Sequence, residues 1–321
     1  MNRKKISRLV LTILAVSLPV LAFWQRYAIY DEIRLYNYKA PYEIGQLANQ
    51  ASMLPSMTKL FFVNHPTLED KEVFNNSCKT AEQTIVLGCY IKGRGIHLLK
   101  VSDSRLNGVE QVTAAHETLH AAYDRLSSSE RKKVDDMTAK YIVSTTDQRL
   151  KDTIELYRQK DPSAIPNELH SILGTEVRTL PADLENYYKR YFYNRLEVVI
   201  YSEQYEQAFT DRKNQISSYD EQLAKLKAQI DNLQTTLTSK SASLISERTR
   251  LNGLKDSGQI SAYNSAVPDF NNRVNQYNLD IDALSSLVSQ YNDIVAKRNE
   301  IAAQETELTK AIDSHSIPAR Q

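Results

Sequence analysis

Two histidines and a glutamate within five consecutive residues are the side chains best suited to chemistry: His116, Glu117 and His120. Histidines four residues apart on a helix lie on the same face, so both imidazoles can bind one metal ion. Glu117 is rotated by about 100° from His116 around such a helix, within reach of a water on that metal. A metal-activated water beside a carboxylate base is the chemistry of peptide hydrolysis. The spacing therefore predicts a Zn²⁺ site with two histidine ligands and Glu117 as the catalytic base.

This chemistry requires a helix, and the residues around the three side chains predict one. Asn107 and Gly108 give a turn signal, and neither Pro nor Gly interrupts residues 109–126. Apolar residues recur at helical spacing through this range, namely Val109, Val112, Ala115, Leu119, Tyr123 and Leu126.

A hydrolytic zinc site takes three protein ligands and keeps one position open, so a third ligand is needed. A later segment predicts a short helix, because Pro166 suits a first turn and Gly174 suits a C-terminal cap. Three residues of this segment compete for the role: Glu168, His170 and Glu176. Glu168 is favoured because it lies inside the helix, and Glu176, in a predicted loop beyond Gly174, remains the alternative.

The pattern H-E-x-x-H at residues 116–120 is the zincin signature, and the chain resembles the gluzincin branch of zinc metallopeptidases. In that branch the ligand glutamate follows on a later helix, often in an Asn-Glu pair, which Asn167 and Glu168 match. The metzincin branch does not fit, because it needs Gly and His where this chain has Tyr123 and Leu126. The resemblance covers about residues 57 to 195.

One position departs from the gluzincin pattern, since the usual acidic residue one turn after the ligand glutamate is Ile172 here. The third ligand therefore stays open between Glu168 and Glu176. The resemblance implies a zinc ion that lowers the pKa of its bound water to about 7. It also implies that Glu117 takes the proton and passes it to the leaving amine of a peptide or protein substrate.

Further roles follow from the same resemblance. An oxyanion donor beside the zinc is expected from His170, Tyr157 or Tyr187, each of which can equally be a packing or surface residue. Asp124, one turn after His120, is placed either to orient a ligand histidine or to be solvated. The strand-like residues 95–101 are interpreted as a sheet edge that receives an extended peptide.

A small β-sheet is predicted ahead of the motif helix, from strand-like runs at residues 59–63, 84–91 and 95–101. Cys78 and Cys89 are the only cysteines and lie eleven residues apart. In an exported chain such an isolated pair predicts a disulfide. The alternative, two zinc thiolates, needs further soft ligands nearby, and the sequence has none.

The N-terminus predicts a membrane anchor. Basic residues precede an apolar run from Leu9 to Trp24, which is slightly short for a span and slightly long for a signal-peptide core. The interpretation is an uncleaved single-pass anchor at residues 1–25, with the C-terminal bulk of the chain outside the cytoplasm. A cleaved signal peptide is the alternative.

The last third of the chain has a heptad pattern, interrupted at residues 256–258. Two apolar arms around a glycine-containing turn predict an antiparallel coiled-coil hairpin, with pairing to another chain (a protein partner or a second copy) as the alternative. The first arm repeats in steps of three and four: Ile216, Tyr219, Leu223, Leu226, Ile230, Leu233, Leu237, Lys240, Leu244, Leu251 and Leu254. The second arm has Tyr263, Phe270, Tyr277, Leu284 and Tyr291 every seven residues, with Val267, Val274, Ile281, Val288 and Val295 between them.

These elements predict a predominantly helical α+β protein. Its acidic and basic residues are interleaved and its net charge is +1, which argues against a nucleic-acid surface. The expected function is a membrane-anchored zinc metallopeptidase, and the alternative is a non-enzymatic envelope scaffold or adaptor acting through its coiled coil. The predicted domains are an anchor (1–25), a linker with a first helix (26–56), a zincin-like domain (57–195) and the hairpin (196–314).

Overall fold

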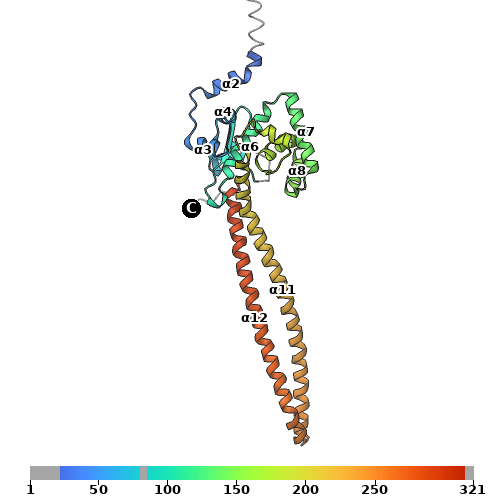
Figure 1. The fold of residues 1–321 in the computed structure, drawn as a ribbon. Coiled ribbons are helices and arrows are strands. Elements are labelled where there is room, and N and C mark those ends of the chain that lie inside the picture. Colours follow the sequence, from blue (N-terminus) through green and yellow to red (C-terminus); the bar gives the residue numbers. More distant parts are fainter. Residues whose placement is uncertain (1–21, 80–84, 315–321) are drawn as a thin grey trace, which may run out of the picture. The chain divides into compact units, whose positions relative to one another are not determined.

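The computed structural model describes residues 22–79 and 85–314. The chain is α+β and predominantly helical, as expected, with a small sheet and two long C-terminal helices (Figure 1). It divides into two compact units. The N-terminal unit comprises Met1–Ala208 and Leu308–Gln321, and the second, here called the hairpin, comprises Phe209–Glu307.

The N-terminal unit packs helices around the sheet. Its first elements are α2 (Arg26–Leu35), α3 (Tyr42–Gln50), α4 (Pro55–Val63), β1 (Thr67–Glu69), α5 (Lys71–Ser77), β2 (Gly88–Ile91), β3 (Gly95–Leu99) and a short 3₁₀ turn (Ser104–Leu106). The remaining helices are α6 (Val109–Asp124), α7 (Ser128–Ser144), α8 (Gln148–Lys160), α9 (Ile165–Thr175) and α10 (Ala182–Tyr188).

The sheet has the strand order β1-β3-β2. β1 runs parallel to β3, with Thr67 opposite His97, and β2 runs antiparallel to β3, with Cys89 opposite His97. The interpretation of residues 95–101 as a sheet edge is therefore wrong, because β3 is the central strand. The three-residue β1 that covers its other side is too short to show a strand pattern in the sequence.

The strand expected at residues 59–63 is also wrong, since this run is the end of helix α4. Pro55 starts the helix in the position where its missing N–H costs nothing. Met57, Leu60 and Phe61 then follow at helical spacing and are buried in the core. A short apolar run fits a strand and a buried helix equally well by periodicity alone.

Helix α6 is the centre of the unit and contacts α3, α4, α9, β2 and β3. It starts after Gly108, whose φ of 104° suits only a residue without a side chain. Thirteen of its sixteen residues are buried, including Glu117 and His120. Polar groups held this deeply need partners, which neighbouring elements supply.

Helix α9 lies against α6 with little space between them. A Cβ at Gly174 would lie 2.5 Å from Cδ1 of Leu119 on α6 and 2.9 Å from the ring of Tyr188. Gly174 is thus inside α9 rather than at its cap, and it permits the close approach of the two helices that carry the predicted metal ligands.

The hairpin consists of the long helices α11 (Arg195–Asp256), whose first turns belong to the N-terminal unit, and α12 (Ile260–Ile312). Arg298 pairs with Asp220 and Lys240 pairs with Asp280, so late residues of α12 meet early residues of α11 and the helices are antiparallel (Figure 1). Leu237 is buried between them, with 7% of its surface exposed.

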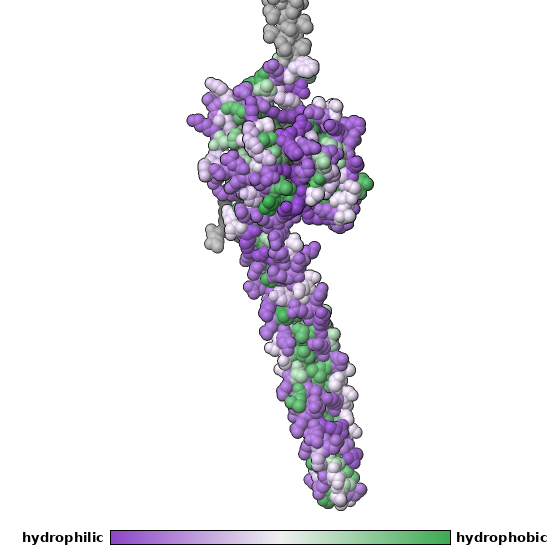
Figure 2. All heavy atoms as spheres, viewed as in Figure 1, coloured by the Kyte–Doolittle hydropathy of each residue, from purple (hydrophilic) through white to green (hydrophobic). Residues whose placement is uncertain are grey.

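Two positions of the second arm differ from the predicted seam. Ile281 and Val288 are 42% and 38% exposed, while their neighbours Asp280 and Leu287 are the half-buried residues. Asp280 takes the inner position because it meets Lys240, the one charged residue in the first arm's seam. The visible face of the hairpin accordingly carries apolar patches between polar stretches (Figure 2).

The prediction of a membrane location is corrected. Among the described residues, no helix is both long and apolar enough to cross a bilayer. The anchor predicted at residues 1–25 falls mainly on residues 1–21, which lie outside the described residues. The helix that follows, α2, is charged rather than apolar, and its Asp31 forms an ion pair with Arg125 at the end of α6.

Candidate metal centre

Helix α6 presents His116 and His120 on one face, with ring centroids 4.7 Å apart. Their side chains are 17% and 11% exposed, so both rings are largely covered and still open to a cleft. This is the geometry that the four-residue spacing on a helix predicts.

Glu168 of α9 completes a group of three possible metal ligands. One carboxylate oxygen lies 3.6 Å from Nε2 of His116, and the other lies 3.6 Å from Nε2 of His120. Taking one ligand atom from each residue, all lie within 4.8 Å of one another. Tetrahedral zinc with bonds of about 2.0–2.1 Å holds its ligand atoms roughly 3.3–3.4 Å apart. The donor set of two imidazoles and one carboxylate thus fits zinc in its chemistry, and the carboxylate oxygens lie close to this spacing from the two imidazoles.

The charges of this group are strongly coupled. Burial opposes a charge on His116, but the carboxylate of Glu168, with those of Glu117 and Glu176, raises the pKa of His116 to about 9. Burial likewise opposes the charge of Glu168, yet the two histidines hold the pKa of Glu168 below its usual value. A site that concentrates negative charge around two imidazoles favours a bound cation.

Glu117 is not part of the ligand group. Its side chain is buried, with 6% exposed, and it lines the same cleft. Burial raises the pKa of Glu117, as a general base working near neutral pH requires. Its carboxylate accepts a hydrogen bond from the backbone N–H of Tyr90 on β2.

The other nitrogens of the two histidines also meet polar groups. Ser171 Oγ lies 3.2 Å from Nδ1 of His120 in a hydrogen bond, and Glu176 lies 4.0 Å from Nδ1 of His116. Such contacts fix the orientation of ligand imidazoles. Glu176, the alternative third ligand, is thus on the far side of His116 from Glu168, where it pairs with Arg149 at 3.1 Å.

Ser171 and Arg149 were missed by the sequence reasoning. Ser171 lies one helical turn after Asn167 and Glu168, so its position on the same face of α9 was a usable signal. Arg149 on α8 gave none, because only the packing of α8 against α9 brings it to Glu176.

The cleft above the three possible ligands has a volume of about 460 Å³. Tyr157 of α8 lines it and forms a hydrogen bond to Glu168, so this candidate oxyanion donor is at the site. Apolar side chains form much of the remaining wall, namely Ile85, Val86, Leu87, Val112 and Leu156.

His170 does not reach the cleft, contrary to its proposed role as an oxyanion donor. It is fully buried, and its Nε2 lies 2.8 Å from the hydroxyl of Tyr187, the other tyrosine candidate. Burial lowers the pKa of His170 to about 3. The two residues form part of an aromatic cluster beneath the site, in which His170 also contacts Tyr123, Tyr188 and Tyr191.

Asp124 does not contact either histidine in the way expected of an orienting residue. It accepts a hydrogen bond from Tyr90 at 3.4 Å and pairs with Lys92 at 3.2 Å. Asp124 therefore ties the end of α6 to β2 and the turn after it, and the orienting contacts come from Ser171 and Glu176 instead.

The predicted disulfide is confirmed, because Cys78 and Cys89 are bonded. Comparisons of the chain with protein-family models, with curated proteins and with solved structures gave no match. Its function is therefore inferred from the site itself.

Proposed function

We propose that the N-terminal unit is a zinc-dependent metallopeptidase of the gluzincin type, which hydrolyses peptide bonds in a peptide or protein substrate. One observation carries this proposal: two histidines of α6 and Glu168 of α9 converge at 3.6 Å, with the buried carboxylate of Glu117 in the same cleft. Buried carboxylates beside histidines are costly to assemble unless the site uses them.

His116, His120 and Glu168 would hold the zinc in this proposal, and all three side chains line the cleft. When bound, zinc supplies a Lewis acid that activates water and polarises the substrate carbonyl. Ser171 and Glu176 keep the two imidazoles in their ligand orientation from the opposite side.

Glu117 takes a proton from the attacking water and passes it to the amine of the leaving group. Burial, which raises the pKa of Glu117, makes its carboxylate a stronger base than an exposed one. Tyr157, whose hydroxyl is at the cleft, donates a hydrogen bond to the developing oxyanion. The apolar walls exclude water from the reacting groups.

The scaffold function remains a second candidate because of the hairpin. Its antiparallel helices expose apolar side chains, among them Leu279 at 61% and Ile281 at 42%, and exposed apolar surface marks interaction sites. A scaffold needs neither zinc nor Glu117, which separates it from the first proposal.

The test is Glu117→Gln, which preserves size and hydrogen bonding but cannot take a proton. Zinc should remain bound at wild-type stoichiometry, measured by atomic absorption. Cleavage of an unfolded protein substrate should fall by about 10²–10⁴-fold, the contribution of a general base.

Glu155→Gln, at an exposed position of α8, is the matched control and should cleave like the wild type. Equal cleavage by both variants, with zinc in each, would rule out Glu117 as the base and remove the basis for the peptidase proposal. Loss of zinc in Glu117→Gln alone would make Glu117 a structural residue of the site.

A further inference from the structure

Strand β2 is the backbone segment that contacts Glu117. A Cβ at Gly88 would lie 2.9 Å from Cγ and 3.0 Å from Oε1 of Glu117, so the strand passes directly over this side chain. Two residues further on, the N–H of Tyr90 donates to the Glu117 carboxylate. Helix α6 therefore carries Glu117, and β2 fixes where its carboxylate points.

The side chains of β2 are only partly buried, so packing stabilises this strand weakly. All four of its residues are half-buried, whereas four of the five residues of β3 are buried. It is also an edge strand, paired within the sheet only with β3. Apolar burial, the main source of stability in a fold, thus contributes less to β2 than to its neighbour.

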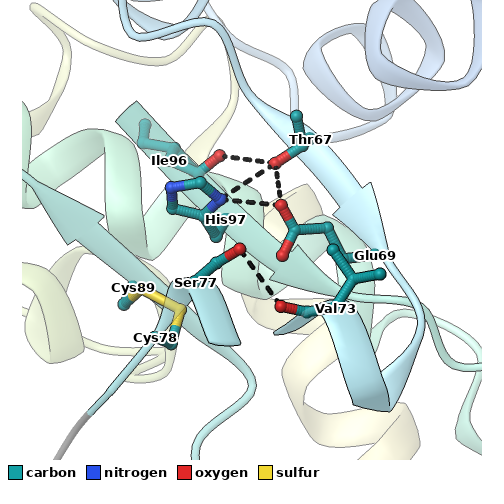
Figure 3. The surroundings of a disulfide bond; sticks show 8 residues. All are labelled: Thr67, Glu69, Val73, Ser77, Cys78, Cys89, Ile96 and His97. Carbon is teal, nitrogen blue, oxygen red and sulfur yellow. Dashed lines mark hydrogen bonds and ion pairs between the residues drawn. A yellow bond between two sulfur atoms is a disulfide. The ribbon is translucent and has the colours of Figure 1, made fainter. Parts of the chain in front are cut away.

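A covalent bond adds an anchor to the pairing of β2 with β3 and to the hydrogen bond between Tyr90 and Asp124. Cys89 lies between Gly88 and Tyr90 and is joined to Cys78, the residue directly after α5 (Figure 3). A small apolar cluster surrounds this disulfide apart from the main core. It consists of Phe74, Cys78 and Leu99, with Val86, Leu87, Cys89 and Val101 packed against it.

The other two strands do not depend on the disulfide. His97 of β3 pairs with Glu69 of β1 at 2.8 Å, and Thr67 donates to the same carboxylate at 2.7 Å (Figure 3). Ile96 and Leu98 of β3 are fully buried in the main core. Loss of the disulfide should therefore loosen β2 and leave β1 and β3 in place.

We propose that the Cys78–Cys89 disulfide is a positioning device for the catalytic base: it holds β2, and through Gly88 and Tyr90 it holds the Glu117 carboxylate in the orientation for proton transfer. This inference rests on the proposed role of Glu117. The zinc ligands lie on α6 and α9, which the disulfide does not touch. Cleaving the disulfide should therefore lower catalysis without releasing zinc, which makes the activity sensitive to reductants.

The experiment compares the full-length wild type with the double variant Cys78→Ser, Cys89→Ser. Hydrogen exchange of the peptide covering residues 85–91 should be at least about tenfold faster in the variant. The value of kcat should fall by about 10–100-fold, as for a slightly misplaced catalytic group, while KM and zinc stoichiometry stay within about twofold. Wild type treated with a water-soluble phosphine should match the variant; the phosphine becomes its oxide with oxygen from water, and the disulfide becomes two thiols.

Removing the disulfide also lowers global stability, so a control must do the same elsewhere. Val134→Ala in α7, away from β2, removes two methyl groups at a fully buried position and leaves a cavity there. It should lower the unfolding midpoint in urea and leave both kcat and exchange at residues 85–91 unchanged. Reoxidation of the phosphine-treated wild type should restore kcat.

Unchanged exchange at residues 85–91 without the disulfide would overturn the inference, and so would fast exchange with unchanged kcat or with loss of zinc. If the oxidised, zinc-loaded wild type cleaves no peptide, the proposed function fails instead. The inference is still decided in that case by Glu117→Ala, which removes the acceptor of the Tyr90 N–H. Amide exchange at Tyr90 should then speed up in Glu117→Ala as it does in the double variant, and an unaltered Tyr90 amide would refute the positioning contact.

Discussion

The candidate metal centre and the hairpin are built on opposite principles. In the centre, His120 is held by Ser171, which lies 51 residues further along the chain, so the contact depends on the packing of α9 against α6. In the hairpin, the environment of a residue such as Leu237 follows from its place in a seven-residue repeat.

This difference decides how each region responds to change. A repeat distributes the stability of the hairpin over many similar contacts. A substitution at an exposed position should therefore change stability little, and one at a seam position should change it in proportion to the burial of the side chain. A centre assembled from α6, α9 and β2 concentrates its function in a few atoms whose positions depend on distant packing. The same kind of substitution should therefore affect stability and zinc binding differently in the two regions.

The largest effect is expected for a charge placed in the hairpin seam. Leu237→Asp buries an uncompensated carboxylate, which should cost about 3–5 kcal/mol of stability. Ile245→Asp on the same helix, where the side chain is 56% exposed, should change stability by no more than about 0.5 kcal/mol. Urea unfolding followed by helical circular dichroism measures both.

Zinc binding should be the same in both hairpin variants, because the three proposed ligands belong to the N-terminal unit. Zinc loss in Leu237→Asp would show that zinc binding depends on the hairpin.

At the metal centre, Glu168→Ala should lower zinc affinity by more than about 100-fold, because it removes a ligand. Glu176→Ala should lower it by about 10–100-fold, the range for residues that orient a ligand histidine. Competition with a chromophoric chelator gives both values, with Glu155→Ala on the surface of α8 as the unaffected control. The reverse order of the two effects would make Glu176 the ligand.

The sequence predicts the parts of this site that one helix determines. The positions of His116 and His120 on one face of α6 follow from their short-range spacing and are observed. Glu168 was favoured over Glu176 because a helix interior holds a side chain more firmly than a loop, and Glu168 lies 3.6 Å from Nε2 of both histidines.

What the sequence could not predict depends on how elements pack together. His170 and Glu168 lie two residues apart on α9, yet one points into an aromatic cluster and the other into the cleft. The spacing of Asp124 allows its side chain to lie either on the surface or at the site. Only the position of β2 determines that Asp124 accepts a hydrogen bond from Tyr90. Residues 59–63 of α4 were predicted as a strand because five residues, four of them apolar, carry too little periodicity.

One substitution should have opposite signs in the two regions. Gly174→Ala adds a methyl group where Leu119 and Tyr188 leave no room, and should destabilise the protein by about 1–3 kcal/mol. Gly253→Ala lies inside α11 with nothing within 4 Å of the added atom, and should stabilise it by about 0.5–1 kcal/mol. Chemical unfolding of both variants measures the difference, and equal signs would contradict the close approach of α6 and α9.

The smallest effect concerns the ionisable groups behind the metal centre. Arg149 lies between two carboxylates, 3.1 Å from Glu176 and 2.7 Å from Glu206. One guanidinium does not compensate two buried negative charges. Burial, together with the charge of Glu176, therefore raises the pKa of Glu206 to about 7, although Arg149 acts in the opposite direction.

A raised carboxyl pKa means that the folded state holds a proton which the unfolded chain has already lost. The stability that this proton confers is complete below the unfolded pKa of about 4.5 and is lost as the pH rises through about 7. Glu206→Gln removes this titration. Its stability should equal that of the wild type near pH 4.5 and exceed it at pH 8 by on the order of 1 kcal/mol, in urea unfolding at both pH values. A wild type that gains stability relative to Glu206→Gln as the pH rises would show that Arg149 fully compensates both carboxylates, and the site would then be less strained by charge than its geometry indicates.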